Sequence, residues 1–398
     1  MLADHETGLL LSGGGARAAY QVGALRAVAS ILGRDRRAPF PVICGTSAGA
    51  INATAIAVDA DNFRTGVARL LRLWRQISVA SVYEADFATV SKQGLRWLAA
   101  VLAGGTGPQK AVSMLDNAPL RRLLTRRVDV SRLEAQVKAG ALHALGISAT
   151  SYSTGTAMTF YQGSPSIVPW RRARRRGVPV PLTIAHLMAS TAIPFIFPAV
   201  KLDRDWYMDG GVRQISPLAP ALHLGARRVL VIAVGRLAGP AAVNAARAAR
   251  AAPRYPTFAQ TAGHALTSIF LDNLSADLER MMQINRVVSL VASQELARRG
   301  LSERHVDAFV LAPSADISEL ALKHANRLPG GVRALLRGLG GTRGSGGALT
   351  SYLLFEPAFC RALLALGYAD AMARREELEA FLGGAAVNYL PLPPPDFD

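Results

Sequence analysis

Two glycine-rich turns, each lying between an apolar run and a helical pattern, constrain the fold of this chain more than any other feature. Apolar residues 8–12 lead into a Gly-Gly-Gly turn, and the residues after it have the spacing of a helix with one apolar face. Apolar residues 40–44 lead into Gly-Thr-Ser-Ala-Gly at 45–49, which is followed by a helix of small side chains. This strand–helix–strand–helix order predicts an α/β fold with a mainly parallel central sheet flanked by helices.

The rest of the chain is predicted to extend this core. Residues 1–235 form the predicted core, with a helical insertion at about 62–127. Residues 236–390 are predicted to form a mostly helical C-terminal extension that packs on the core, with helices over 270–286 and 357–382. The first part of this extension, to about Pro256, has the Ala, Arg and Pro content of a mobile loop or lid. The proline-rich residues 391–398 predict a disordered tail.

Composition sets the class of protein. Half of the residues are hydrophobic and 18% are charged, which is enough apolar side chain for a large buried core. No apolar run reaches the ~18 residues that a membrane span needs, and Asp4 and Glu6 stand where a signal peptide would be basic. We therefore expect a cytoplasmic protein without a signal peptide or transmembrane segment. The two cysteines, Cys44 and Cys360, do not suggest a disulfide framework.

The chain is strongly basic, with a net charge of +17 that comes mostly from arginine. A basic surface attracts anionic partners, but no nucleic-acid module and no basic stripe interleaved with aromatics is present, so we expect no nucleic-acid partner. The densest cluster is predicted to be an exposed loop, which is either simply solvated or contacts anionic lipid head groups at a peripheral membrane surface. Its members are Arg171, Arg172, Arg174, Arg175 and Arg176.

The Gly-Thr-Ser-Ala-Gly turn has the pattern of a nucleophile elbow. A tight turn between a strand and a helix holds Ser47 in a strained conformation with its hydroxyl presented, and the flanking Gly45 and Gly49 leave room for the backbone. The helix that begins after Ser47 directs its positive end toward the site. By itself the pattern is only moderately specific, because chains rich in Gly, Ala and Ser contain it by chance.

The first glycine turn is suited to holding an oxyanion. Acyl transfer needs backbone N–H donors directed at the tetrahedral intermediate, and three glycines allow successive N–H groups to point the same way. Gly13-x-Gly15-x-x-Ala18 also fits a dinucleotide-binding fingerprint, although the acidic residue at the required spacing, Asp35, precedes the second strand and does not end it. A Walker-type phosphate loop is excluded, because no Gly-Lys-Ser/Thr follows.

Asp209, in the sequence Asp209-Gly210-Gly211, is the candidate base. A desolvated carboxylate close to a serine can take its proton directly, whereas the usual triad needs a histidine. The histidines His143, His186, His223 and His264 have no motif around them, and we expect structural or surface roles for them.

In this order, the three motifs resemble the patatin-like phospholipase family, whose pattern is a glycine-rich oxyanion loop with a following basic residue, then G-x-S-x-G, then D-G-G or D-G-A. The segment 189–194, Ala-Ser-Thr-Ala-Ile-Pro, resembles the family's A-S-x-A-x-P. The resemblance spans roughly residues 8–234 and implies that Ser47 attacks an ester and Asp209 activates it. It further implies an oxyanion hole and a set of supporting glycines, which are Gly13, Gly14, Gly15 and Arg17 for the hole, and Gly45, Gly49, Gly210 and Gly211 for support.

The resemblance implies a phospholipase A or esterase acting through an acyl-enzyme on phospholipid or another acyl lipid, with no cofactor or metal. Three alternatives remain open from the sequence. The chain could be an α/β-hydrolase with a Ser-His-Asp triad, a non-catalytic lipid- or protein-binding module on the same fold, or a dinucleotide-binding protein. The head group, acyl chain and oligomeric state are not encoded in any motif.

Overall fold

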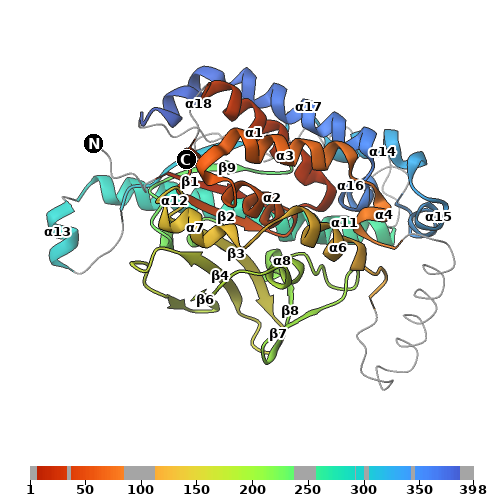
Figure 1. Ribbon diagram of the computed structural model, residues 1–398, viewed down its shortest axis with the longest axis horizontal. Coiled ribbons are helices and arrows are strands. Elements are labelled where there is room, and N and C mark those ends of the chain that lie inside the picture. Colours follow the sequence, from red (N-terminus) through yellow and green to blue (C-terminus); the bar gives the residue numbers. More distant parts are fainter. Residues whose placement is uncertain are drawn as a thin grey trace, which may run out of the picture.

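A mixed sheet in the middle of the molecule carries the fold, with helices on both of its faces (Figure 1). The computed structural model describes residues 7–33, 37–84, 113–236, 257–291, 293–299, 304–341 and 346–385. The predicted lid at 237–256, the tail at 391–398 and the central part of the helical insertion, 85–112, lie outside the described residues. Within the described residues the sheet has ten strands. They are β1 (Thr7–Leu11), β2 (Val42–Thr46), β3 (Ala144–Ser151), β4 (Ala157–Gly163), β5 (Arg171–Arg172), β6 (Arg175–Pro179), β7 (Val200–Leu202), β8 (Asp205–Asp209), β9 (Arg228–Ile232) and β10 (Asp307–Leu311).

The first half of the sheet is parallel and the second half is mixed. The order is β10-β9-β1-β2-β3-β4-β6-β5, and the strands from β10 to β3 all run the same way. β4 runs antiparallel to β3, and β8 pairs antiparallel with the last residues of β3. The predicted α/β class is therefore confirmed, and the carboxyl ends of β1, β2 and β3 share one edge of the sheet.

Alternate side chains of the central strands enter two separate cores, because helices cover both faces of the sheet. On β9, Leu230 and Ile232 pack into the larger core, whereas Val229 and Val231 pack into the smaller one. The helices are α1 (Ala19–Ile31), α2 (Ala48–Ala57), α3 (Phe63–Gln76), α4 (Val79–Val82), α6 (Ala118–Arg127), α7 (Arg132–Lys138), α8 (Ile184–Ser190), α9 (Ala219–His223), α11 (Phe258–Thr267), α12 (Asn273–Ser289), α13 (Ser293–Arg298), α14 (Ile317–His324), α15 (Gly330–Gly338), α16 (Gly347–Leu353), α17 (Pro357–Ala373) and α18 (Arg375–Leu382).

The C-terminal region is part of the same fold as the N-terminal region. β10 pairs with β9 at the edge of the sheet, and α17 lies along α1 on the outer surface (Figure 1). β10 was not predicted from the sequence, because a short apolar run has no periodicity that distinguishes a buried strand from a helix. A single helix was predicted over 357–382, but the chain breaks at Arg374 between α17 and α18.

Two further local expectations are corrected by the structure. The arginine cluster at 171–176 was predicted as a loop, but it forms the two-stranded hairpin β5–β6, and β6 also pairs with β4. The helix predicted from Phe270 begins earlier, with a π-helical turn at Ser268–Asp272 that connects α11 to α12. No single described helix is long and apolar enough to cross a bilayer, although α16 and α17 together meet the length and composition test with a bend of 98°.

Candidate active site

Ser47 occupies the sharp turn between β2 and α2, as the sequence predicts. Its backbone φ is 56°, a left-handed conformation that is costly for a residue other than glycine. A Cβ atom on Gly45 would lie 2.5 Å from the carbonyl oxygen of Gly49, and one on Gly49 would lie 2.3 Å from that of Leu11. Both flanking positions therefore require glycine, because any side chain would separate α2 from the strands beneath it.

A second serine, which the sequence analysis did not assign a role, holds the turn in place. The backbone N–H of Ser47 donates to Oγ of Ser190 at 2.9 Å, and that hydroxyl donates in turn to the carbonyl oxygen of Ser148 at 2.6 Å. Ser190 is fully buried at the end of α8. It lies in the Ala-Ser-Thr-Ala-Ile-Pro segment, so the signal was visible in the sequence, but its contact with the elbow was not.

Strand register brings Asp209 beside Ser47. The last residue of β2, Thr46, is paired with Ser148 on β3, and the next residue of β3, Ala149, is paired with Asp209 on β8. Thr150 of β3 is paired with β4 and with β8 at once, so β8 lies on the side of β3 where β2 has ended. Asp209 therefore follows in line with β2, at the position where Ser47 leaves the sheet.

The carboxylate of Asp209 is fully buried and has few partners. Its Oδ1 accepts from the N–H of Gly211 at 2.9 Å, and its Oδ2 makes no hydrogen bond of standard geometry with any described residue. Burial raises the pKa of Asp209 to about 7, and the Ser47 hydroxyl and the Gly211 N–H oppose that rise. An unpaired carboxylate oxygen next to a serine hydroxyl is suited to accept a proton, and such contacts often tighten only when substrate binds.

The glycine loop at 13–15 faces the same site. A Cβ on Gly13 would lie 3.0 Å from Cβ of Ser47, so the loop lies directly against Ser47. The backbone N–H groups of Gly13 and Gly14 make no hydrogen bond to the part of the chain that the structure describes. These two donors are therefore available to an oxyanion, while Gly14 itself accepts from the N–H of Arg17 at 3.1 Å.

An aromatic ring closes one side of the site. Phe270, on the π-helical turn, lies so close to the glycine loop that a Cβ on Gly13 would be 2.4 Å from its ring. The same ring is 2.5 Å from the Cβ position of Gly211, next to Asp209. Sequence reasoning gave no signal for Phe270, because it is distant in the chain from all three motifs.

Arg17 is turned toward the C-terminal helices. Its guanidinium donates to Oγ of Ser351 at 2.6 Å and to Oγ of Ser318 at 3.2 Å, and it lies over the ring of Tyr352 at 4.3 Å. These contacts bind the glycine loop to α16 and α14, so that Arg17 supports the loop from behind. The role in the oxyanion hole that the resemblance implies finds no contact in this arrangement.

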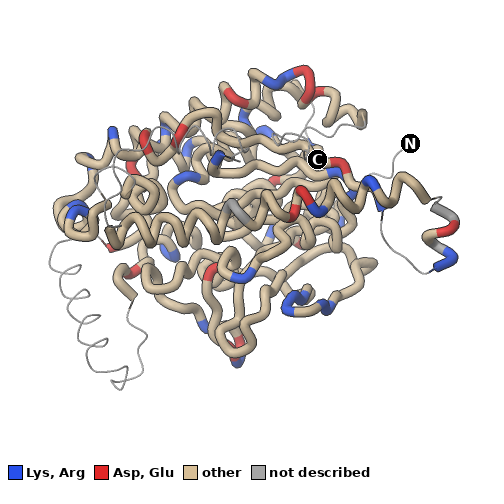
Figure 2. Tube along the Cα trace, turned by 180° about the vertical axis from the view of Figure 1, so that it is seen from behind, with Lys and Arg blue, Asp and Glu red and all other residues tan. Residues whose placement is uncertain are grey.

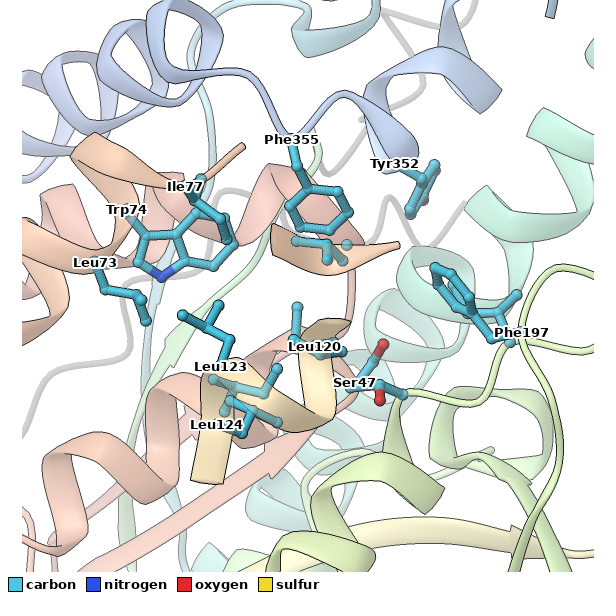
Figure 3. Close-up of a pocket in the computed structure, with 16 residues that line it drawn as sticks. Ser47, Leu73, Trp74, Ile77, Leu120, Leu123, Leu124, Phe197, Tyr352 and Phe355 are labelled. Atoms are coloured by element: carbon cyan, nitrogen blue, oxygen red, sulfur yellow. The ribbon is translucent and has the colours of Figure 1, made fainter. Parts of the chain in front are cut away.

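An apolar pocket opens above Ser47. Its volume is about 40 Å³, and Figure 3 shows side chains of α3 and α6 on one side of Ser47 and Phe197 on another. Apart from Ser47 and Thr191, its lining consists of glycine and of apolar and aromatic residues, with Trp74, Leu120, Leu123, Leu124, Tyr352 and Phe355 among them. Trp74 is held by a hydrogen bond from its Nε1 to Asn52 and by stacking on Phe355. The helical insertion and the C-terminal extension thus meet over Ser47.

The four histidines considered in the sequence are engaged away from Asp209. Nδ1 of His186 caps its own helix at Thr183, and the ring of His223 stacks on Trp170 at 4.7 Å. His143 lies with His223 at a separate cavity, and His264 is exposed on α11. None of the four lines the pocket above Ser47. Asp35, which the dinucleotide alternative needs, lies outside the described residues.

Comparisons with known proteins identify the family of the chain. Residues 9–222 match the family model described as patatin-like phospholipase. A curated protein of Pseudomonas aeruginosa, strain BWHPSA011 / Pa011, named a cGAMP-activated phospholipase, is 27% identical over 215 residues, which are 54% of this chain and 55% of that protein. The chain thus spans about half the length of this relative. The solved structure of VipD from Legionella pneumophila aligns with 94% of this chain and 67% of its own, at 12% identity and a TM-score of 0.35.

Proposed function

The chain belongs to the patatin-like phospholipase family, and on that premise we propose that it is a serine lipid acyl hydrolase that works through a Ser47–Asp209 dyad. One observation carries the proposal. The strained elbow serine directs its hydroxyl to a fully buried carboxylate, Asp209, whose Oδ2 has no other hydrogen-bond partner among the described residues. The glycine loop lies against Ser47 at Gly13, and the N–H groups of Gly13 and Gly14 make no hydrogen bond to the described residues, which supports a role for them as oxyanion donors.

The proposed reaction has two steps. Asp209 accepts the Ser47 hydroxyl proton as Oγ attacks the ester carbonyl, and the N–H groups of Gly13 and Gly14 hold the oxyanion. When the intermediate collapses, the C–O bond to the alcohol breaks and Asp209 returns the proton to the departing oxygen. Asp209 then takes a proton from water as the water attacks the acyl-Ser47 ester. When this second intermediate collapses, the bond between the acyl carbon and Oγ breaks, Asp209 returns the proton to Oγ, and the fatty acid is released. No metal or cofactor is needed to balance either step.

The test is labelling with a fluorophosphonate probe, together with release of fatty acid from phospholipid vesicles. We expect the wild-type protein to react and Ser47→Ala to lose both labelling and hydrolysis, since the variant removes only one hydroxyl. Ser190→Ala removes the hydroxyl that holds the Ser47 turn but leaves Ser47 itself unchanged. This variant is therefore expected to weaken labelling without abolishing it. Folded wild-type protein that neither labels nor hydrolyses would favour the binding-module alternative.

The apolar pocket is proposed to hold the acyl chain. It is narrow, so the chain enters by moving side chains apart, and each methylene that it buries contributes about 0.8 kcal/mol.

Leu123→Trp is expected to shorten the preferred acyl chain. Leu123 is half-buried at the pocket wall, so the larger ring can fill the space without disturbing the core. Loss of room for about three methylenes corresponds to a roughly 50-fold or larger fall in kcat/KM for long-chain relative to short-chain esters. The ratio is to be measured on a series of p-nitrophenyl esters of increasing chain length. Leu71→Trp, on the same side of the molecule but outside the pocket lining, is the control and should leave the ratio unchanged. An equal change in both variants would place the chain elsewhere.

A further inference from the structure

Three exposed turns lie on the same edge of the sheet as Ser47. They are residues 152–154 after β3, residues 173–174 between β5 and β6, and residues 203–204 between β7 and β8. Thr46 is level with Ser148 on β3, then with Thr159 on β4 and Gly177 on β6. β6 runs opposite to β2, so the residues before Gly177 extend past this row on the side where Ser47 follows Thr46. The β5–β6 hairpin therefore projects from the catalytic edge, three strand spacings or roughly 14 Å from β2.

The hairpin concentrates positive charge that nearby acidic residues do not balance. Its five arginines form no ion pair with any described residue, and four of the five are exposed. The sequence has no acidic residue between Glu134 and Asp203. Figure 2 shows the hairpin as a dense blue group near the lower border of the molecule.

The turn of the hairpin retains an arginine where folding favours glycine. Arg174 has a backbone φ of 56°, in the left-handed region where glycine or asparagine costs less. Its side chain is exposed, so packing gives no reason for the choice. The tip of the hairpin thus presents a positive charge at a position where glycine would cost less.

Two exposed aromatic side chains lie on turns across a hollow from the hairpin. Tyr152 follows β3 and is 47% exposed, Trp206 on β8 is 51% exposed, and the N–H of Tyr152 donates to the carbonyl oxygen of Trp206 at 2.9 Å. A hollow of about 590 Å³ separates these turns from the hairpin, and it is lined by the hairpin arginines, by hydroxyls of the β3–β4 turn and by Asp205. Burial raises the pKa of Asp205, but hydrogen bonds from Ser151, Ser153 and the N–H of Trp206 lower it overall. Asp205 is the one carboxylate that lines the hollow with the five arginines.

We propose that this surface, called the basic edge and made up of Arg171–Arg176, Tyr152 and Trp206, docks the protein on an anionic phospholipid bilayer. The arginines would contact lipid phosphates, and the two aromatic rings would lie at the level of the head groups, where amphipathic rings are favoured. Because the basic edge is on the Ser47 side of the sheet, docking would bring the mouth of the site to the lipid. The purpose of this docking rests on the proposed function, but the binding test below does not require any hydrolysis.

The test is cosedimentation with vesicles of phosphatidylcholine alone and with vesicles in which one third is phosphatidylglycerol. Binding is measured in the Ser47→Ala background, so that the vesicles stay intact. We expect Arg172→Gln/Arg174→Gly/Arg176→Gln to lower partitioning onto the anionic vesicles on the order of 100-fold. The three side chains are exposed, and the glycine relieves the turn, so folding is preserved.

A matched control carries the same change in net charge elsewhere. Arg72, Arg75 and Arg361 are exposed on α3 and α17, which lie along the upper border in Figure 1, away from β6. Replacing these three with glutamine should change partitioning by no more than about threefold, and added salt should release the wild-type protein. Trp206→Ala should weaken binding without any change in charge.

The outcomes separate this inference from the proposed function. With Ser47 intact, the hairpin variant should hydrolyse a soluble short-chain ester as fast as the wild type, but it should lose activity on anionic vesicles. Equal partitioning of the hairpin and control variants would overturn the basic edge even if ester hydrolysis is observed. Selective binding through the hairpin without hydrolysis of any ester would instead leave the basic edge standing and remove the proposed function.

Discussion

Asparagine in place of Asp209 is expected to lower kcat/KM for ester hydrolysis by about 10³-fold, because the amide keeps the size of the carboxylate but cannot accept the Ser47 proton. The loss should appear in kcat, since the pocket that binds the acyl chain is not altered. Asp205→Asn is the matched control. It changes a carboxylate on the same strand that is hydrogen-bonded to Ser151 and not to the site, and its activity should stay within about threefold of the wild type.

The same carboxylate should set the pH dependence of activity. Only ionised Asp209 can act as a base, and burial raises its pKa to about 7, so kcat/KM should rise with pH and reach half of its plateau near pH 7. The measurement is kcat/KM for a soluble ester from about pH 5 to about pH 9, a range that extends roughly two pH units below and above the pKa of Asp209. A half-maximal value near pH 4 would mean that another group, or a solvated carboxylate, takes the proton.

Stability should move in the opposite direction to activity. The folded state holds the Asp209 proton up to about pH 7, whereas in the unfolded chain the carboxyl group has its ordinary pKa of 3.8 and releases the proton there. Between these values the folded state binds more protons, so the free energy of unfolding should fall as pH rises toward 7. Asp209→Asn removes this fall, so above pH 7 the inactive variant should be at least as stable as the wild type in urea unfolding.

A histidine variant that lost activity while Asp209→Asn kept it would contradict the Ser47–Asp209 dyad and would instead indicate a triad.

The second large effect concerns stability and lies far from the site. Gly23→Ala on α1 is expected to lower the free energy of unfolding by about 3 kcal/mol, because the new methyl group has no room. A Cβ at Gly23 would lie 2.1 Å from the carbonyl oxygen of Leu364 on α17, and one at Gly367 would lie 2.1 Å from that of Tyr20 on α1. The two helices therefore cross in backbone contact, and each requires glycine at the crossing.

Urea unfolding tests this expectation against a helix glycine that touches nothing. Gly338 is in α15, and a Cβ there would meet no atom within 4 Å, so Gly338→Ala should be neutral or should stabilise by up to about 1 kcal/mol. Gly367→Ala should resemble Gly23→Ala, and the double variant should cost less than the sum, since both changes separate the same pair of helices. A Gly23→Ala variant as stable as Gly338→Ala would mean that α17 can move off the core.

The sequence carried information about the site because each catalytic motif is local. An apolar run that ends in glycine and continues as a helix encodes a strand, a turn and a helix within a few residues, so the positions of the glycine loop and of Ser47 follow from the chain itself. Asp209 was found by the order of motifs in a familiar family pattern. Its place beside Ser47, however, comes from the pairing of β8 with the end of β3, which no spacing in the sequence reveals.

Residues that act through distant contacts could not be read from the chain. The hydroxyl of Ser190 under the elbow, the ring of Phe270 over the glycine loop and the attachment of Arg17 to α16 each join segments that are remote in sequence. The arginine cluster was visible as charge, but its projection from the catalytic edge depends on the register of β4 and β6.

The sequence by itself therefore determined the fold class, the elbow and the glycine loop, because periodicity and turn chemistry act over a few residues. Only the tertiary structure decided which side chains close the pocket, where Asp209 lies relative to Ser47, and which surface faces outward beside them. Those features depend on strand pairing and helix packing between parts of the chain that the sequence does not place side by side.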